Sequence, residues 1–405
     1  SVGHHRDRLG LGSLGGRADR AEAAAALLQD KLDVELLCVP DGDGAGAALP
    51  QTRLRVVQAG EVTGISGWLG TFEVRWRSAN PIDLDLCTRC NACVQADCVR
   101  VCEAAGAIDF TREPREGEGR YDLVLDLQSA PAFAQHQPPQ GYAHVPPQAG
   151  DRELFDAAMR LRELSGEFDK PKFFQYKQKL CAHSRNEKVG CTACIDVCSA
   201  KAVRSDASLK GKSPTQAKVR RPDQAHVVGG QGGGIIVEPF LCVGCGACTT
   251  VCPSGALSYQ MPTAPETGAR LRTMLQAWRA AGGSERPGAP IILLHSQERG
   301  SALIDELGRL SSLGRSGADG RVLRGLPPRV LPVALWHTAS AGLELWLSAL
   351  CWGAAEVAVL LSGEEAPEYR LALQEQVDLA QALWKGLGLP GQGVKLVSLG
   401  SVAIT

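Results

Sequence analysis

The sequence lacks a charge excess of either sign and an uninterrupted apolar run. Its 43 Lys and Arg residues nearly balance its 44 Asp and Glu residues, for a net charge of −1, which excludes a generally basic nucleic-acid-binding protein. The most apolar stretch, 341–362, contains Glu344, Glu356 and a glycine near its middle. It therefore predicts a buried helix followed by a strand, and no membrane span. The first residues, SVGHHRDRLG, lack both the apolar segment of a secretory signal and an initiator Met.

Cysteine, in contrast, is abundant. The sequence holds 15 cysteines, an odd number grouped at short spacings, which argues for metal binding in a reducing compartment rather than for disulfides. We therefore expect a cytoplasmic protein. Cys38 and Cys351 stand alone among apolar residues and are predicted to be buried core thiols. The other cysteines fall into three groups with the spacing of metal ligands.

The last group has the most informative spacing. Four cysteines and a proline follow the pattern C-x2-C-x2-C-x3-C-P: Cys242, Cys245, Cys248, Cys252 and Pro253. This pattern resembles the ligand run of bacterial ferredoxins, which hold cubane 4Fe-4S clusters. Gly244 and Gly246 let the backbone approach a cluster and aim N–H groups at its sulfurs. A four-thiolate zinc site is the less favoured alternative, because zinc ribbons use two separated C-x2-C pairs.

A second group lies upstream and resembles the other half of a two-cluster ferredoxin. Cys191, Cys194 and Cys198 keep the end of the pattern, whereas the first ligand has moved to Cys181. This half departs from the family by a long loop after its first cysteine and by Ser199 where the family has Pro. The resemblance implies crossed ligation, because the fourth cysteine of each run binds the other cluster. The implied sets are Cys181, Cys191, Cys194 with Cys252, and Cys242, Cys245, Cys248 with Cys198. Beside the first ligand, His183 is expected to be a solvated loop histidine rather than a ligand.

The first group contains five cysteines, which do not divide into fours: Cys87, Cys90, Cys93, Cys98 and Cys102. The segment CEAAGAI resembles the end of a ferredoxin half, which assigns Cys102 to a cluster with the first three and leaves Cys98 spare. A second account is equally open. CTRCNACVQA resembles the opening of one half and DCVRVC the close of the next, without the stretch between them. Three 4Fe-4S clusters are therefore expected, or four if residues are missing between Cys93 and Cys98.

Composition and periodicity predict a multidomain α/β and α+β protein. The expected segments are a small α/β domain (1–80), an N-terminal 4Fe-4S module (81–128), a linker with an amphipathic helix (129–169), a dicluster ferredoxin module (170–262) with a basic insertion (205–234), and a C-terminal α/β domain (265–405). Gly10, Gly12 and Gly15 match G-x-G-x-x-G, but a dinucleotide fingerprint needs a preceding strand, and SVGHHRDRL predicts none.

The C-terminal stretch alternates short apolar strands with helices. The predicted strands are 291–295, 330–336, 356–361 and 394–399, and the predicted helices are 270–280, 301–310, 341–352 and 368–385. This alternation predicts a doubly wound parallel sheet. It resembles the small flavodoxin-like subunit of hydrogenase and heterodisulfide reductase complexes. A ligand around His337, Thr338 and Ser340 is one interpretation, but no phosphate loop or flavin motif is present, and a partner-binding or structural domain is favoured.

These observations predict an electron-transfer protein that carries single electrons through several 4Fe-4S clusters between a redox enzyme and a carrier. As a whole, the chain resembles multi-cluster iron–sulfur proteins of proteobacteria that accompany formate dehydrogenases, which implies such an enzyme or a similar oxidoreductase as partner. No catalytic residue is predicted, because no nucleophile or acid–base pair is present. The alternative is an oxidoreductase subunit with its own flavin or substrate site in the C-terminal domain.

The segment 170–221 is strongly basic, with 13 basic residues and three acidic ones. This excess of positive charge predicts either a solvated loop or a docking face for an acidic partner.

Overall fold

The computed structural model describes two compact units of the chain. The described residues are 8–14, 18–39, 55–58, 61–78, 86, 115–166, 170–183, 190–205, 234–283, 288–316, 320, 322 and 324–398. The units are Ser1–Ala134 with Pro138–Asp169, and Gln135–Gln137 with Lys170–Thr405. The cysteine-rich module that begins near Lys170 therefore shares one unit with the C-terminal sheet.

The first unit is built on a parallel sheet with the strand order β3-β2-β1-β7-β8. Its strands are β1 (Arg8–Leu14), β2 (Asp33–Val39), β3 (Arg55–Gln58), β7 (Leu123–Asp126) and β8 (Tyr142–His144). Helices α1 (Ala18–Leu28) and α3 (Asp151–Glu163) share a buried core with this sheet, in which Leu28, Leu123 and Leu161 are almost fully enclosed. The segment 129–169, predicted as a linker with a helix, thus also contributes strand β8. A strand of this length is too short to produce a visible alternation of apolar and polar residues in the sequence.

Two glycines of the motif near the start of the chain, Gly10 and Gly12, lie in a strand, and Gly15 lies outside the described residues. Contrary to the sequence prediction, β1 begins at Arg8, and Gly10 and Gly12 pair within the sheet with Glu35 and Leu37 of β2. A dinucleotide fingerprint places its glycines in the turn after the strand. These glycines therefore do not occupy the fingerprint position.

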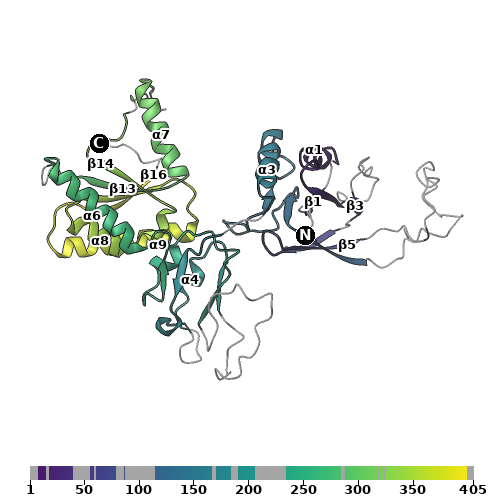
Figure 1. Cartoon of the computed structure of the whole chain (residues 1–405), viewed down its shortest axis with the longest axis horizontal. Coiled ribbons are helices and arrows are strands. Elements are labelled where there is room, and N and C mark those ends of the chain that lie inside the picture. The colour runs from purple at the N-terminus through teal and green to yellow at the C-terminus, as the bar shows by residue number, and fades with distance from the viewer. Residues whose placement is uncertain are drawn as a thin grey trace, which may run out of the picture. The chain divides into compact units, whose positions relative to one another are not determined.

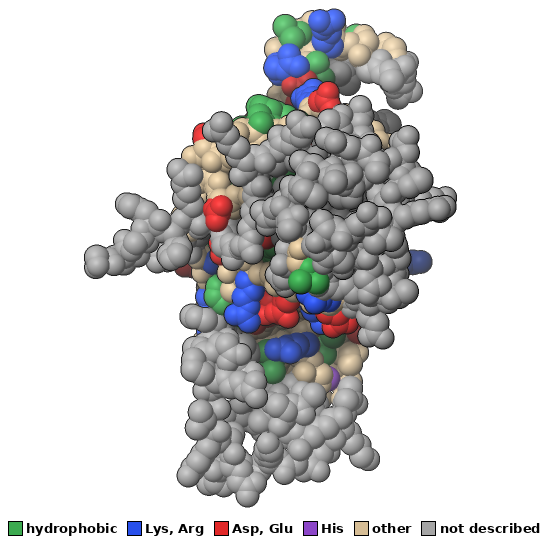
Figure 2. Space-filling view, turned by 90° about the vertical axis from the view of Figure 1, so that its right-hand side faces the viewer, with side chains coloured by type: hydrophobic (Ala, Val, Ile, Leu, Met, Phe, Trp, Pro, Cys, Tyr) green, Lys and Arg blue, Asp and Glu red, His purple; other side chains and the backbone are tan. Residues whose placement is uncertain are grey.

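An antiparallel sheet completes the first unit. It consists of β4 (Glu61–Ser66), β5 (Phe72–Ser78) and β6 (Arg115–Tyr121). Strands β5 and β6 pair from Phe72 opposite Tyr121 to Ser78 opposite Arg115. The cysteine-containing segment 79–114 therefore connects two residues, Ser78 and Arg115, that are paired in the sheet. Cross-strand ion pairs such as Arg120 to Glu73 lie on this sheet. On the face drawn in Figure 2, Lys and Arg side chains lie beside Asp and Glu side chains rather than in a patch of one sign.

The second unit begins with a small module of two antiparallel strand pairs. β9 (Phe174–Tyr176) pairs with β12 (Leu257–Tyr259), and β10 (Val203–Ser205) pairs with β11 (Ile235–Val237). The short helices α4 (Ala193–Asp196) and α5 (Ala247–Thr250) lie between the strands in sequence. Because Ser205 pairs with Ile235, the chain leaves for the basic insertion and returns from it at neighbouring positions.

The C-terminal part of the second unit is a four-stranded parallel sheet with the order β14-β13-β15-β16. Its elements are α6 (Ala264–Ala280), β13 (Ile291–Ser296), α7 (Arg299–Ser312), β14 (Val330–Leu335), the 3-10 helix η5 (Thr338–Ser340), α8 (Leu343–Cys351), β15 (Glu356–Leu361), α9 (Pro367–Gly386) and β16 (Val394–Ser398). Helices cover both faces of the sheet, with α7 on one side and α6, α8 and α9 on the other (Figure 1). The predicted strands and helices are all present.

Two details differ from the sequence prediction, and one prediction falls outside the described residues. Helix α6 begins at Ala264, before residue 270, because Thr263 and Glu266 form a capping box that stabilises its first turn. Cys351, predicted to be buried, is exposed at the last residue of α8. The side chain of Cys38 lies outside the described residues.

Among the residues that the structure describes, no helix has both the length and the apolar character needed to cross a membrane.

The central strand β13 should contribute strongly to stability. Leu294 on this strand is fully buried, so Leu294→Ala should lower the free energy of unfolding of the C-terminal part by about 2–5 kcal/mol through lost burial and the cavity left behind. Leu387, which follows α9 and is 74% exposed, is the matched control. Leu387→Ala should change the free energy of unfolding by less than about 0.5 kcal/mol. Urea unfolding followed by tryptophan fluorescence measures both, and equal effects would contradict the described core.

Candidate metal centres

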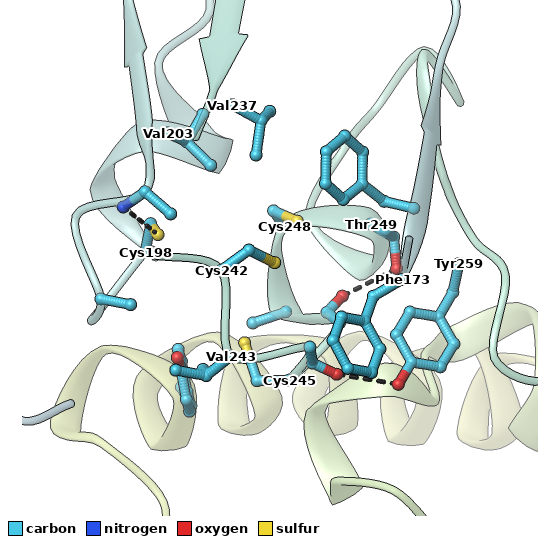
Figure 3. A pocket seen from close by; sticks show the side chains of 17 residues that line it. Phe173, Cys198, Val203, Val237, Cys242, Val243, Cys245, Cys248, Thr249 and Tyr259 are labelled. Atoms are coloured by element: carbon cyan, nitrogen blue, oxygen red, sulfur yellow. Dashed lines mark hydrogen bonds between the residues drawn. The ribbon is translucent and has the colours of Figure 1, made fainter. Parts of the chain in front are cut away.

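Four cysteines of the second unit line one cavity, which we name site A: Cys198, Cys242, Cys245 and Cys248. They come from the segment after α4, the loop after β11, and α5. Figure 3 shows these side chains around the cavity together with apolar side chains such as Phe173 and Val237. Counted together with its opening to solvent, the cavity has about 430 Å³ of empty space.

Two glycines shape the loop that carries the first ligands of site A. Gly244 and Gly246 have φ values of 74° and 81°, a region that other residues adopt only with strain. A Cβ atom on Gly244 would lie 2.5 Å from the Phe173 ring, and one on Gly246 would lie 2.6 Å from Cβ of Ser340. The loop therefore follows a tight path, along which the N–H of Gly244 donates a hydrogen bond to Cys242.

Burial raises the pKa of three thiols of site A: Cys242, Cys245 and Cys248. It raises the pKa of Cys245 to about 12 and the pKa of Cys248 well above its usual range, because apolar surroundings disfavour a thiolate. The neighbouring thiols raise the pKa of Cys248 further, since like charges repel. Hydrogen bonds from the Tyr369 hydroxyl and from the N–H of Ala247 favour the Cys245 thiolate. Four thiolates at this site therefore require positive charge between them.

A second cavity, site B, is lined by the remaining four cysteines of this module: Cys181, Cys191, Cys194 and Cys252. Counted together with its opening to solvent, it has about 310 Å³ of empty space. Burial, with the neighbouring thiols, raises the pKa of Cys194 to about 12. At Cys252 burial also acts to raise the pKa, but hydrogen bonds from the N–H of Leu257 and from Ser254 outweigh it, so the pKa is lowered. Site B thus combines an apolar wall with donors aimed at one sulfur.

The donor sets fit iron–sulfur clusters. Each site presents four thiols on the wall of an apolar cavity, and thiolates are the ligands of cubane clusters. Backbone N–H groups donate to the sulfurs, from Ala202 to Cys198 at 3.3 Å and from His183 to Cys181 at 3.4 Å. In the described part of the chain, no group of three or more His, Cys, Asp or Glu side chains is arranged around a single metal ion. The thiols line two separate cavities, four to each.

His183 is not the solvated histidine predicted from the sequence. It is 3% exposed, and its ring nitrogens contact the carbonyl of Cys191 at 2.9 Å and the hydroxyl of Ser205 at 2.7 Å. Both nitrogens are therefore occupied, and the ring ties the long loop after Cys181 to the next ligand segment. The polar and basic residues around His183 predicted a solvated loop, so its burial could not be recognised from the sequence.

Three side chains near the sites were missed from the sequence. Tyr369 of α9 lines site A, Tyr176 of β9 lines site B, and Lys170 donates to the carbonyl of Phe240 at 2.7 Å. Tyr369 lies more than a hundred residues from the last ligand, so no local spacing could have linked it to the site. The cysteines of the first group, Cys87, Cys90, Cys93, Cys98 and Cys102, lie outside the described residues.

The two cavities predict which cysteine change damages which site. Cys252→Ala should abolish the cluster signal of site B and retain that of site A, because its sulfur faces the cavity of Cys181, Cys191 and Cys194. Cys198→Ala should do the reverse. Each change should remove about four irons, measured by iron content and by electron paramagnetic resonance of the reduced protein. The exposed Cys351→Ala is the control and should leave both signals unchanged. Loss of the site A signal in Cys252→Ala would mean that the ligands pair differently.

Comparison with known proteins identifies the type of module that carries these cavities. Residues 189–256 match the family model of a 4Fe-4S dicluster domain. The match includes every cysteine of sites A and B except Cys181, which the fold brings to site B from outside the matched segment. No curated protein matches the chain. The segment 189–256 is therefore a ferredoxin-type domain, and its match and cysteines support binding of 4Fe-4S clusters.

Proposed function

We propose that this protein transfers single electrons through several 4Fe-4S clusters between a redox enzyme and a carrier. The observation that carries the proposal is the pair of four-thiol cavities within one ferredoxin-type domain. Helix α4 carries Cys194 of site B and is followed by Cys198 of site A, and α5 carries Cys248 of site A and is followed by Cys252 of site B. Four residues of helix advance by about 6 Å, so the ligands of the two sites lie close enough for electrons to pass between them.

The protein's own residues provide the surroundings for electron transfer. A bound 4Fe-4S cluster takes up and releases one electron. The chain holds the cluster through four thiolates, keeps water away with side chains such as Phe173 and Val237, and donates hydrogen bonds to the sulfurs. These donors stabilise the more negative reduced state and thereby set the reduction potential.

The alternative function, a flavin or substrate site in the C-terminal domain, is less well supported. In doubly wound sheets, ligands bind beyond the carboxyl ends of the strands, where the strand order reverses. Here η5, after β14, packs against α5 of the ferredoxin module, and Thr250 of α5 donates to the carbonyl of Ala339 at 3.3 Å. Beyond β15, Glu365 accepts hydrogen bonds from Ser362 and from the N–H of Gly363. These contacts use several polar groups of this edge within the protein and favour a structural role for the domain. Among the described residues, Nε2 of His337 and Oγ1 of Thr338 are buried at this edge without a hydrogen-bond partner.

Iron content tests the cluster number. With clusters at sites A and B and a third held by Cys87, Cys90, Cys93 and Cys102, we expect about twelve irons per chain and no stoichiometric zinc. About sixteen irons would support a fourth cluster with Cys98 among its ligands, and eight would remove the N-terminal cluster from the proposal. The measurement is iron, zinc and acid-labile sulfide analysis of protein purified without oxygen. The absence of iron would contradict the proposed function.

We propose that the acidic face of a redox partner docks beside site B. Five lysines of the basic stretch form the predicted docking face: Lys172, Lys177, Lys179, Lys188 and Lys201. In the structure Lys172, Lys177, Lys179 and Lys201 are exposed. Lys188, the fifth lysine of the predicted docking face, lies outside the described residues. Lys177 and Lys179 lie in the short segment that leads directly into Cys181. A formate dehydrogenase or a similar oxidoreductase is our proposal for the partner, on the family resemblance alone.

Charge reversal tests this docking face. Changing Lys172, Lys177 and Lys179 to Glu should lower the second-order rate of electron transfer to the partner at least about tenfold, because steering by opposite charges accelerates encounter. The wild-type rate should also fall steeply with added salt, which screens exposed charges over about 8 Å at physiological ionic strength. Cluster content and reduction potentials should not change.

Lys385, exposed in the last turn of α9, provides the matched control on the C-terminal domain. Lys385→Glu makes the same kind of charge change and should leave the transfer rate unaltered. Stopped-flow measurements at several salt concentrations compare the variants. A rate that responds to Lys385→Glu and not to the three reversals would move the docking face to the C-terminal domain.

A further inference from the structure

A tyrosine of the C-terminal domain reaches a ligand of site A. Tyr369 lies in the first turn of α9, is fully buried and lines the site A cavity. Cys245 lines the same cavity and borders the same buried cluster as Tyr369, and the Tyr369 hydroxyl favours the Cys245 thiolate, which partly offsets the rise that burial causes in the pKa of that thiol. The same hydroxyl bonds to the hydroxyl of Ser199, so Ser199, Tyr369 and Cys245 form a chain of polar contacts that joins both ferredoxin halves to α9.

Packing fixes the position of this tyrosine. Its ring shares a buried cluster with Val197, Ala247 and Ala339, and Cys245 and Cys248 border that cluster. The His337 ring packs edge-on against it with a centroid distance of 5.4 Å. Burial raises the pKa of Tyr369, which keeps the hydroxyl protonated and able to donate.

Ser199 explains a departure of this chain from the ferredoxin pattern. The residue after the fourth cysteine is Pro253 in the second half but Ser199 in the first. Proline has no side-chain hydroxyl, whereas Ser199 is buried and bonds to Tyr369. The substitution thus provides a polar partner at the point where the C-terminal domain meets site A.

We propose that Tyr369 of the C-terminal domain acts on the cluster at site A through Cys245. By donating a hydrogen bond to the sulfur of Cys245, it raises the reduction potential of that cluster. The inference rests on the proposed function. A donor to a cluster sulfur stabilises the additional negative charge of the reduced cluster, so its removal lowers the potential. In addition to its structural role, the C-terminal domain thereby contributes a residue to the electron-transfer site.

Two other tyrosines supply matched comparisons. Tyr176 lines site B, and its hydroxyl bonds to Cys181, which is the equivalent contact at the other site. Tyr259 lines site A, but its hydroxyl donates to the carbonyl of Gly244 at 2.8 Å. Replacement of Tyr259 by Phe therefore removes a hydroxyl from the same cavity without removing a donor to sulfur.

The experiment measures the potentials of both clusters by redox titration with electron paramagnetic resonance on the full chain. Tyr369→Phe should lower the potential of one cluster, with about a tenfold decrease in the equilibrium constant for reduction, which is 59 mV for one electron. Tyr176→Phe should lower the potential of the other cluster. Tyr259→Phe should shift neither by a comparable amount. Iron content and the midpoint of thermal unfolding are measured for each variant, because a purely structural role would alter these without a selective change in potential.

The outcomes separate the inference from the proposed function. A wild-type protein without cluster signals would contradict the proposed function itself. Wild-type signals with an unchanged potential in Tyr369→Phe, or a shift of the same cluster by Tyr369→Phe and Tyr176→Phe, would overturn only the inference. If Tyr369→Phe does not assemble, Ser199→Ala is the second variant. It removes the partner of the tyrosine hydroxyl and should shift the site A potential in the same direction by a smaller amount, and an unchanged potential would overturn the inference.

Discussion

The arrangement of the second unit depends on bringing eight thiols into two apolar cavities. Thiolates in such surroundings are unstable unless cations lie between them, because burial and mutual repulsion both favour the protonated form. The raised pKa values of Cys194, Cys245 and Cys248 express this constraint. The surrounding fold offsets it with N–H groups and hydroxyls aimed at the sulfurs. Iron supplies the remaining positive charge in the proposed function.

The short helices α4 and α5 connect the two cavities, because the cysteines in and after each helix line different cavities. Each helix is associated with ligands of both sites, so neither half of the module can complete a site alone. Helix α4 contacts β10 of one antiparallel strand pair, and α5 contacts β12 of the other. This arrangement ties the spacing between the cavities to the length of a helical turn, which suits electron transfer between two fixed centres.

The C-terminal sheet contributes directly to site A. Its loop after β14 and the first turn of α9 lie against the ferredoxin module, with Ala339 and Tyr369 in a common buried cluster. The edge of a doubly wound sheet that usually receives a small ligand is here in contact with another part of the same chain. A fold known for ligand binding can therefore serve as a wall and a hydrogen-bond donor for a neighbouring redox site.

The sequence alone determined the type of chemistry and much of the local structure. The run from Cys242 to Pro253 identifies its cofactor class because cluster ligation demands a fixed spacing. The C-terminal elements were predictable because strands and helices have different apolar periods. Only the tertiary structure revealed the burial of His183 and the presence of strand β8, since neither has a local pattern in the sequence. Only it brought Tyr369 to Cys245, because contacts between residues far apart in the chain depend on how whole elements pack.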